Sequence, residues 1–171
     1  MFKAGLVSTV LTCALISLAT GSSWSTAATV GLAMIGVGQA LGIPSGMTAG
    51  AVISGSYFGD KMSPLSDTTN LSPAMVGADL FVHIRHMAWT TGPSVLIALM
   101  IFTFMGLNVE AGQAPAGEIS AARDLLEQNY SIGIPALLPL VLLLALAMRK
   151  VPAFPSISIG ALAGCVVALI W

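Results

Sequence analysis

From Ala4 to Gly59 the chain contains no Asp, Glu, Lys, Arg or His. A membrane-spanning helix needs about 20 apolar residues, so this run is long enough for two crossings and a remainder. Three further charge-free runs, at 87–109, 128–148 and 151–171, are each long enough to cross once. Only 8% of all residues are charged, against about 25% in soluble domains. The sequence therefore predicts a membrane protein.

Polar and glycine-rich breaks interrupt the first run. Thr20–Ser25 separates a helix expected at 4–19 from one expected at 26–43, and Gly42–Gly46 precedes an apolar piece at 47–59 that is too short to span. Non-helical backbone occurs at membrane depth only where it is buried in protein or lines a water-filled cavity. We therefore expect an all-α, polytopic fold of transmembrane helices with discontinuous or re-entrant segments: five crossings, or four with re-entrant hairpins.

Several function classes are excluded at this stage. A formal net charge of −1 leaves no basic surface for nucleic acid. Cys13 and Cys165 lie in apolar runs without a CxxC or Cys/His grouping, so neither a disulfide framework nor a zinc site is indicated. His83 and His86 lack the HExxH glutamate and a third ligand of metalloproteases, and no nucleophile elbow or P-loop is present. We do not expect an enzyme.

Oxygen ligands are concentrated between Ile53 and His86. Carboxylates and neutral oxygens together suit a hard cation such as Na+, and unwound backbone carbonyls commonly complete its shell in discontinuous transport helices. Pro64 and Pro73 are expected to supply the unwinding, since each lacks a backbone donor. The candidate ligands for Na+ and H+ are Asp67, Asp60, Ser66, Thr68, Thr69 and Asn70, with Ser63 as a further neutral oxygen.

Asp67 ranks above Asp60 because two hydroxyls and an amide follow it directly and because it lies between the two prolines. Desolvation favours the protonated form of a carboxyl group and a bound cation favours the ionised form, so one carboxylate can hold either a proton or Na+. Lys61 is expected to tune the site. In the alternative interpretation, residues 66–70 only cap the start of a helix. The sequence alone leaves both the ion site and the helix cap open.

The basic residues suggest an orientation. His83, Arg85 and His86 precede one span and Arg149–Lys150 follow another, whereas the loop at 108–128 is acidic. Because basic loops prefer the cytoplasm, we expect the loop at 108–128 to be extracytoplasmic. A role of His83 or His86 in pH sensing is a further hypothesis, since imidazole titrates near neutrality.

Asp79 is expected in the first turn of a helix that begins at Leu80, where a carboxylate suits the positive end of the helix dipole. It is not counted among the candidate ligands.

The motif GDKMSPLSDTTNL, at Gly59–Leu71, closely resembles the NhaC family of Na+/H+ antiporters, a group of ion transporters with inverted repeats, and the resemblance extends over about 21–107. It implies a multi-pass secondary transporter of the cell's inner membrane that exchanges Na+ for H+. The motif positions carried over from the family are Asp60, Lys61, Ser63, Ser66, Asp67, Thr68, Thr69 and Asn70. The expected partners are the lipid bilayer and the transported ions Na+ and H+, without a cofactor.

Members of that family are much longer, so the resemblance implies that 1–171 is a single membrane transport domain from the C-terminal portion of such a chain. A site at a repeat interface would then lack one wall, and the missing half of the transporter or a homo-oligomer would be a partner. Two alternatives stay open. One is an exchanger of an organic acid, such as malate or lactate, or of an amino acid, coupled to Na+ or H+. The other is an inactive fragment or a partner-dependent membrane subunit.

Overall fold

The computed structural model describes residues 5–108 and 133–170, which form only helices and turns. The predicted all-α class is confirmed. The chain divides into two compact units, Met1–Ala114 and Pro115–Trp171, and each is described by itself. The loop predicted at 108–128 lies outside the described residues except for Asn108.

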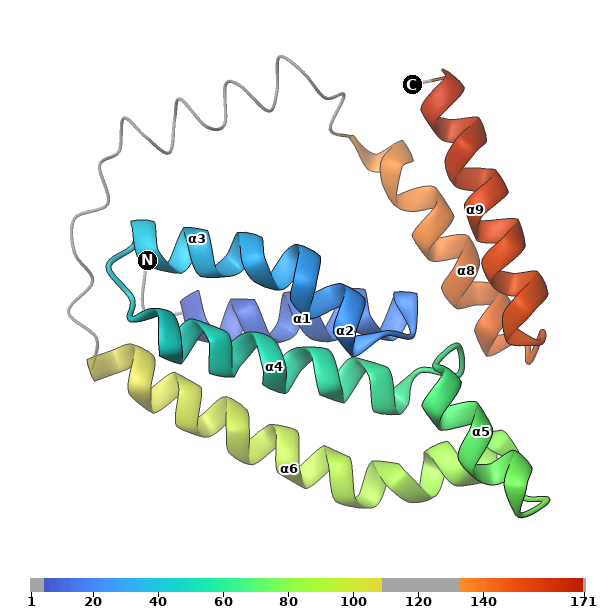
Figure 1. The fold of residues 1–171 in the computed structure, drawn as a ribbon, viewed down its shortest axis with the longest axis horizontal. Helices are drawn as coiled ribbons and strands as arrows, with labels where there is room; N and C mark the ends of the chain where they lie inside the picture. The colour runs from blue at the N-terminus through green and yellow to red at the C-terminus, as the bar shows by residue number, and fades with distance from the viewer. Residues whose placement is uncertain (1–4, 109–132, 171) are drawn as a thin grey trace. The chain divides into compact units, whose positions relative to one another are not determined.

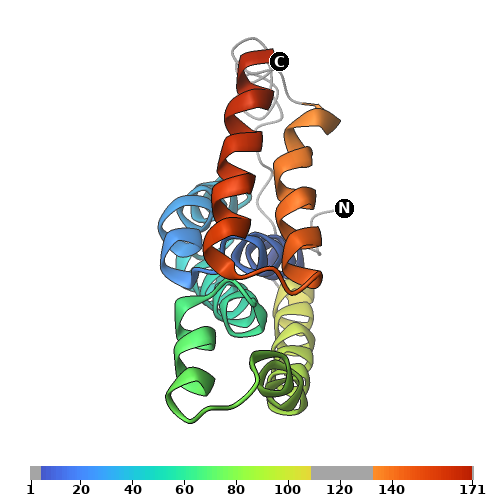
Figure 2. The ribbon, with the colours of Figure 1, turned by 90° about the vertical axis from the view of Figure 1, so that its right-hand side faces the viewer.

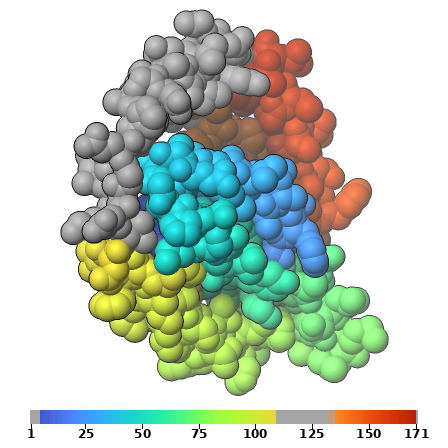
Figure 3. All heavy atoms as spheres, turned by 60° about the vertical axis from the view of Figure 1, so that its left-hand side comes forward, coloured from blue at the N-terminus to red at the C-terminus, as the bar shows by residue number. Residues whose placement is uncertain are grey.

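The first unit is built around the pair α1 and α4, and α4 also lies between α3 and α6 (Figures 1 and 3). Its elements in chain order are α1 (Gly5–Thr20), α2 (Ser23–Thr26), the π-helical turn η2 (Ala27–Gly31), α3 (Leu32–Ala40), α4 (Ser45–Met62), α5 (Asp67–Met75) and α6 (Leu80–Asn108).

Two glycines one helical turn apart bring α4 against α1. A Cβ on Gly55 would collide with the backbone carbonyl of Val10, and one on Gly59 would lie 2.6 Å from the Leu18 nitrogen. Real Cβ atoms essentially never come this close to backbone, so only glycine allows this approach. In lipid such small-residue contacts replace the missing hydrophobic drive between helices.

The predicted helix breaks are present, with two corrections. The first break is shorter than expected, because α1 ends at Thr20 and α2 begins at Ser23. The apolar piece expected at 47–59 is part of the longer helix α4, whose last turn accommodates Asp60 and Lys61. A cation in the last turn suits the negative end of the helix dipole.

The prolines act differently. Pro64 lies in the break between α4 and α5, as predicted. Pro73 lies inside α5, which continues to Met75, so the expectation that it unwinds the chain is wrong. The missing N–H of Pro73 falls six residues, or nearly two turns, after the helix start at Asp67, and α5 ends two residues later.

The helix α6 begins where the sequence predicted. Asp79 Oδ1 accepts hydrogen bonds from the backbone N–H groups of Phe81 and Val82, both at 3.0 Å. The carboxylate thus satisfies two donors that a helix start otherwise leaves free. The helix then continues to Asn108 with Pro93 inside it.

The second unit is a helical hairpin. A 3₁₀ turn (Ile134–Leu137) leads into α8 (Leu138–Met148), and α9 (Ala153–Ile170) returns beside it, as the two ribbon views show (Figures 1 and 2). Lys150, with φ of 62°, turns the chain between them. Gly160 fits under the Leu143 side chain, where a Cβ would lie 2.9 Å from Leu143 Cδ1.

Among the described residues, α6 and α9 are long and apolar enough to cross a membrane, and Gly5–Thr20 and Pro135–Met148 are shorter apolar helices. Large apolar side chains on α6, such as Met100 and Phe104, are exposed. An apolar helix face of this size is suited to lipid. These helices agree with a membrane protein.

Candidate cation-binding site

The predicted polar stretch forms the last turn of α4, a four-residue break at 63–66 and the first turns of α5. Pro64 lies within the break and cannot donate a backbone hydrogen bond. The Ser63 N–H donates to the Asp60 carbonyl (3.2 Å). The Ser63 hydroxyl donates to the Leu18 carbonyl of α1 (2.7 Å). The break is therefore anchored to α1.

A second break touches the first. Gly21, between α1 and α2, has φ of +69°, a conformation that L side chains rarely adopt. A Cβ there would lie 2.7 Å from the carbonyl carbon of Leu65 and 2.8 Å from the Ser66 nitrogen. Only glycine fits this position. Here the break between α1 and α2 contacts the break between α4 and α5.

Asp60 is a buried carboxylate, with 9% of its surface exposed. Its Oδ2 accepts a hydrogen bond from the Ser23 hydroxyl at the start of α2 (2.9 Å). Its Oδ1 is also buried and has no hydrogen-bond partner within residues 5–108 and 133–170. A buried carboxylate oxygen without a donor is costly, and it can accept a proton or coordinate a cation.

Asp67 lies in a different environment, because its side chain is exposed in the first turn of α5. Its Oδ1 accepts a hydrogen bond from the neighbouring Thr68 N–H (2.8 Å). A carboxylate at this position also suits the positive end of the helix dipole. Asp60 is thus the buried carboxylate and Asp67 the exposed one, whereas the sequence ranked Asp67 above Asp60 as a candidate ligand.

The hydroxyls around Asp67 cap α5. The Ser66 hydroxyl accepts from the Thr69 N–H (3.4 Å) and shares a hydrogen bond with the Thr68 hydroxyl (2.9 Å). Ser66 has extended backbone, as helix N-caps do. The capping arrangement that the sequence left open is therefore present at Ser66.

Two other candidate ligands hold the break in shape. The Asn70 amide donates to the carbonyls of Pro64 (2.8 Å) and Ser66 (2.7 Å). The buried Thr69 hydroxyl lies 3.2 Å from the Asp60 carbonyl and 3.3 Å from the Lys61 carbonyl. Of the candidates in α5, Thr69 is thus the one bonded to the end of α4.

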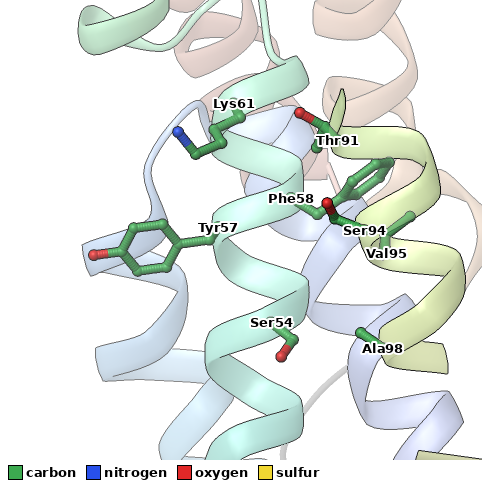
Figure 4. A pocket seen from close by; sticks show the side chains of 8 residues that line it. All are labelled: Ser54, Tyr57, Phe58, Lys61, Thr91, Ser94, Val95 and Ala98. Carbon is green, nitrogen blue, oxygen red and sulfur yellow. The ribbon is translucent and has the colours of Figure 1, made fainter. Parts of the chain in front are cut away.

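The three residues predicted to tune the site lie at its margins. Lys61 is exposed, and Figure 4 shows its ammonium group extending from α4 on the side away from α6. His83 is half-buried and His86 exposed, both in the first two turns of α6.

Sequence reasoning missed two serines beside Asp60. Ser56, 1% exposed, precedes Asp60 by one helical turn and shares its face of α4. Its hydroxyl faces the Cys13 thiol, a weak hydrogen-bonding group, and is hydrogen-bonded to no nitrogen or oxygen in the described part of the chain. The spacing of four residues could have indicated Ser56, but no local signal pairs Ser23 with Asp60. We call Ser23, Ser56 and Asp60 the Asp60 cluster.

The donor set of the Asp60 cluster is a carboxylate and hydroxyls, which are ligands for hard cations. In the described ranges, no group of three or more His, Cys, Asp or Glu side chains is placed to hold a metal ion. The chemistry available at the cluster is therefore proton uptake and oxygen coordination.

Residues 55–171 match the model of the Na+/H+ antiporter family. The chain belongs to this family. The match includes Ser56, Asp60 and the whole motif at 59–71.

Curated relatives bear the NhaC name, as the resemblance predicted. The Na+/H+ antiporter NhaC of Alkalihalophilus pseudofirmus is 45% identical over 162 residues, which cover 95% of this chain and 35% of the relative. The malate-2H+/Na+-lactate antiporter of Bacillus subtilis is 39% identical over 97% of this chain and 36% of its own length. The arginine/ornithine antiporter ArcD of Halobacterium salinarum is 39% identical, over 91% and 32%.

The chain spans about a third of the length of these relatives. No solved structure matches it.

Proposed function

We propose that the chain forms the ion-binding part of a multi-pass secondary transporter that exchanges Na+ for H+ across the cell's inner membrane. Its family and its NhaC-named relatives support this activity. The apolar helices α6 and α9 support insertion in a bilayer. In this function Na+ and H+ are transported substrates, and no cofactor or catalytic step is needed.

The observation that carries the proposal is the unpartnered Oδ1 of Asp60. One carboxylate can hold a proton or Na+, because the cation favours the ionised form and desolvation favours the protonated form. Sodium must therefore leave before a proton binds. If the site opens to each side of the membrane in turn, this competition is sufficient for exchange.

The other candidate residues have supporting roles in this proposal. Thr69 fixes the carbonyl at the end of α4, and Ser66, Thr68 and Asn70 hold the break and the start of α5 in shape. Asp67, exposed beside them in the first turn of α5, is a second ion ligand. Lys61, His83 and His86 adjust the local charge.

The test is Na+-triggered collapse of a preformed proton gradient in inverted membrane vesicles. We expect Asp60→Asn to abolish the Na+ response, because its amide cannot exchange a proton for Na+. The matched variant Asp67→Asn should weaken the response without abolishing it. A full response from Asp60→Asn, or a loss confined to Asp67→Asn, would return Asp67 to first rank and refute the role given to Asp60.

Binding can be measured separately from transport. A ligand at 100 times its Kd stabilises the folded state by about 2.7 kcal/mol. We expect NaCl, but not choline chloride, to raise the unfolding midpoint of the purified chain, and Asp60→Asn to remove the difference. Binding without a proton response would indicate that exchange requires a partner, either the remainder of a longer transporter or a second copy.

A second candidate function is exchange of an organic acid or an amino acid coupled to Na+ or H+. The names of the Bacillus subtilis and Halobacterium salinarum relatives favour it. Adding malate, lactate or arginine to the same vesicles separates the two functions. Na+-dependent proton movement without any organic substrate supports Na+/H+ exchange.

A further inference from the structure

A cavity of about 340 Å³ lies between α2, η2 and α4. Its lining residues are Ser23, Trp24, Ala27, Ile53, Ser56 and Tyr57. The large side chains are exposed at its rim, Trp24 at 81% and Tyr57 at 49%. A water molecule occupies about 30 Å³ of liquid, so the cavity has room for a sodium ion with several of its waters.

The walls of this cavity are mostly apolar, and Ser23 and Ser56 are the two serines among its lining residues. Ser23 and Ser56 are 4% and 1% exposed and the Ser56 hydroxyl oxygen is itself buried, so both serines lie behind the exposed side chains of the rim. The Ser23 hydroxyl donates to Asp60 Oδ2, and the Ser56 hydroxyl, which faces the Cys13 thiol, is hydrogen-bonded to no nitrogen or oxygen in the described ranges. Two of the three members of the Asp60 cluster therefore line the cavity, and the carboxylate lies one hydrogen bond behind them.

The wall opposite α4 contains an irregular helix. Ala27 begins the π-helical turn η2, which widens the helix at the cavity. Such π-turns occur frequently at functional sites. The π-helical turn is a feature of the backbone, so it is an observation independent of the buried side-chain atoms. It borders the same cavity.

We propose that the cation reaches Asp60 through the α2–α4 cavity and is held there by the hydroxyls of Ser56 and Ser23 together with the carboxylate. The Ser56 hydroxyl and Asp60 Oδ1 are its ligands, and the Ser23 hydroxyl orients Oδ2 while its own oxygen is a third ligand. The rim formed by Trp24 and Tyr57 is the entrance. This inference rests on the proposed function for the identity of the ion, and it adds two ligands outside the 59–71 motif and a direction of entry.

The experiment measures thiol accessibility in the full chain, after Cys13→Ala and Cys165→Ser remove the native thiols. Ile53→Cys, at a lining position of the cavity that holds no proposed ligand, is exposed to the small cationic reagent methanethiosulfonate ethylammonium in NaCl or in choline chloride at equal ionic strength. We expect modification in choline chloride and about a tenfold slower rate at Na+ ten times its Kd, because only about a tenth of the sites is then free.

The matched control is Ser54→Cys. Ser54 is the next residue of the same helix and lines another cavity, of about 230 Å³ between α4 and α6, which shares Tyr57 with the first (Figure 4). Na+ should leave its modification rate unchanged. Ala27→Cys repeats the measurement from the opposite wall, in case Ile53→Cys does not fold.

Two results would overturn the inference. Thiols at 53 and 27 that resist the reagent while a thiol at 54 reacts would show that the cavity is closed. Modification that Na+ does not slow would show that the ion does not occupy it. Neither result depends on proton movement, so this experiment tests the cation site separately from the exchange activity. Na+ protection without a proton response would support the cation site and would refute exchange by this chain alone.

Discussion

Replacing Gly59 by alanine should separate α1 from α4. The new Cβ would lie 2.6 Å from both the Leu18 nitrogen and the Ser17 Cβ, and it would also collide with the Ala14 carbonyl. Ordinary contacts are about 3.5–4.0 Å, so the helices must move apart by roughly 1 Å. Because two of the opposing atoms are backbone, no side-chain rotation relieves the clash.

The size of the effect follows from two opposing terms. Overpacking costs about 1–3 kcal/mol, and alanine in a helix interior is favoured over glycine by about 0.5–1 kcal/mol. We therefore expect Gly59→Ala to lower the free energy of unfolding by about 1–2 kcal/mol. The matched variant Gly50→Ala, on the same helix, meets only Phe102 at 3.7 Å and should be neutral or slightly stabilising.

The assay is SDS-induced unfolding of the purified chain in mixed micelles, followed by circular dichroism. The two variants should differ by about 2 kcal/mol. If Gly59→Ala were as stable as Gly50→Ala, α4 would not pack on α1 as described, and the burial of Asp60 would lose its explanation.

Two further substitutions test the contact between the breaks. Gly21→Ala should cost at least about 1–2 kcal/mol in the same assay, because the residue has positive φ and touches the backbone of Leu65. Gly77→Ala, with φ of +68° but nothing within 4 Å, should cost less, and equal losses would argue against the contact. Ser66→Ala should remove the α5 cap, costing about 1 kcal/mol and speeding hydrogen exchange of the Thr69 amide. An unchanged exchange rate would contradict the capping role.

Local rules account for much of what the sequence predicted. The charge-free runs predicted the apolar helices. Gly21 and Pro64 lie in breaks of the structure because their backbone preferences act within one or two residues. Asp79 was placed correctly for the same reason, since a cap is made with the next few N–H groups. Pro73 was misread, because a proline near the end of a short helix need not stop it at once.

The local sequence does not show which of the two carboxylates is buried. Asp67 has a rich set of polar neighbours, but these hydroxyls and amides satisfy one another and the helix start. Asp60 is buried because Gly59 lets α1 approach and because Ser23, 37 positions earlier, donates to it. Both contacts are long-range, so only the packed structure shows them.

The length of α6 sets the depth of the cation site. Its 29 residues extend over about 43 Å, whereas the hydrocarbon core is about 30 Å thick. Counting about 20 residues back from Asn108 reaches Trp89, which is 79% exposed and suited to the interface with the lipid headgroups. The turns that hold His83 and His86 then lie outside the hydrocarbon.

Lys61 and Thr91 line the same cavity, so the end of α4 lies close to that boundary. From there α4 extends back to Ser45, about 25 Å across the bilayer. A cation bound at Asp60, as proposed, would therefore be shallow on the side of the histidines and deep on the other. Most of the membrane voltage, about 2.3 kcal/mol per charge per 100 mV, would act on its passage to the far side, which makes that passage the electrically sensitive step of the cycle.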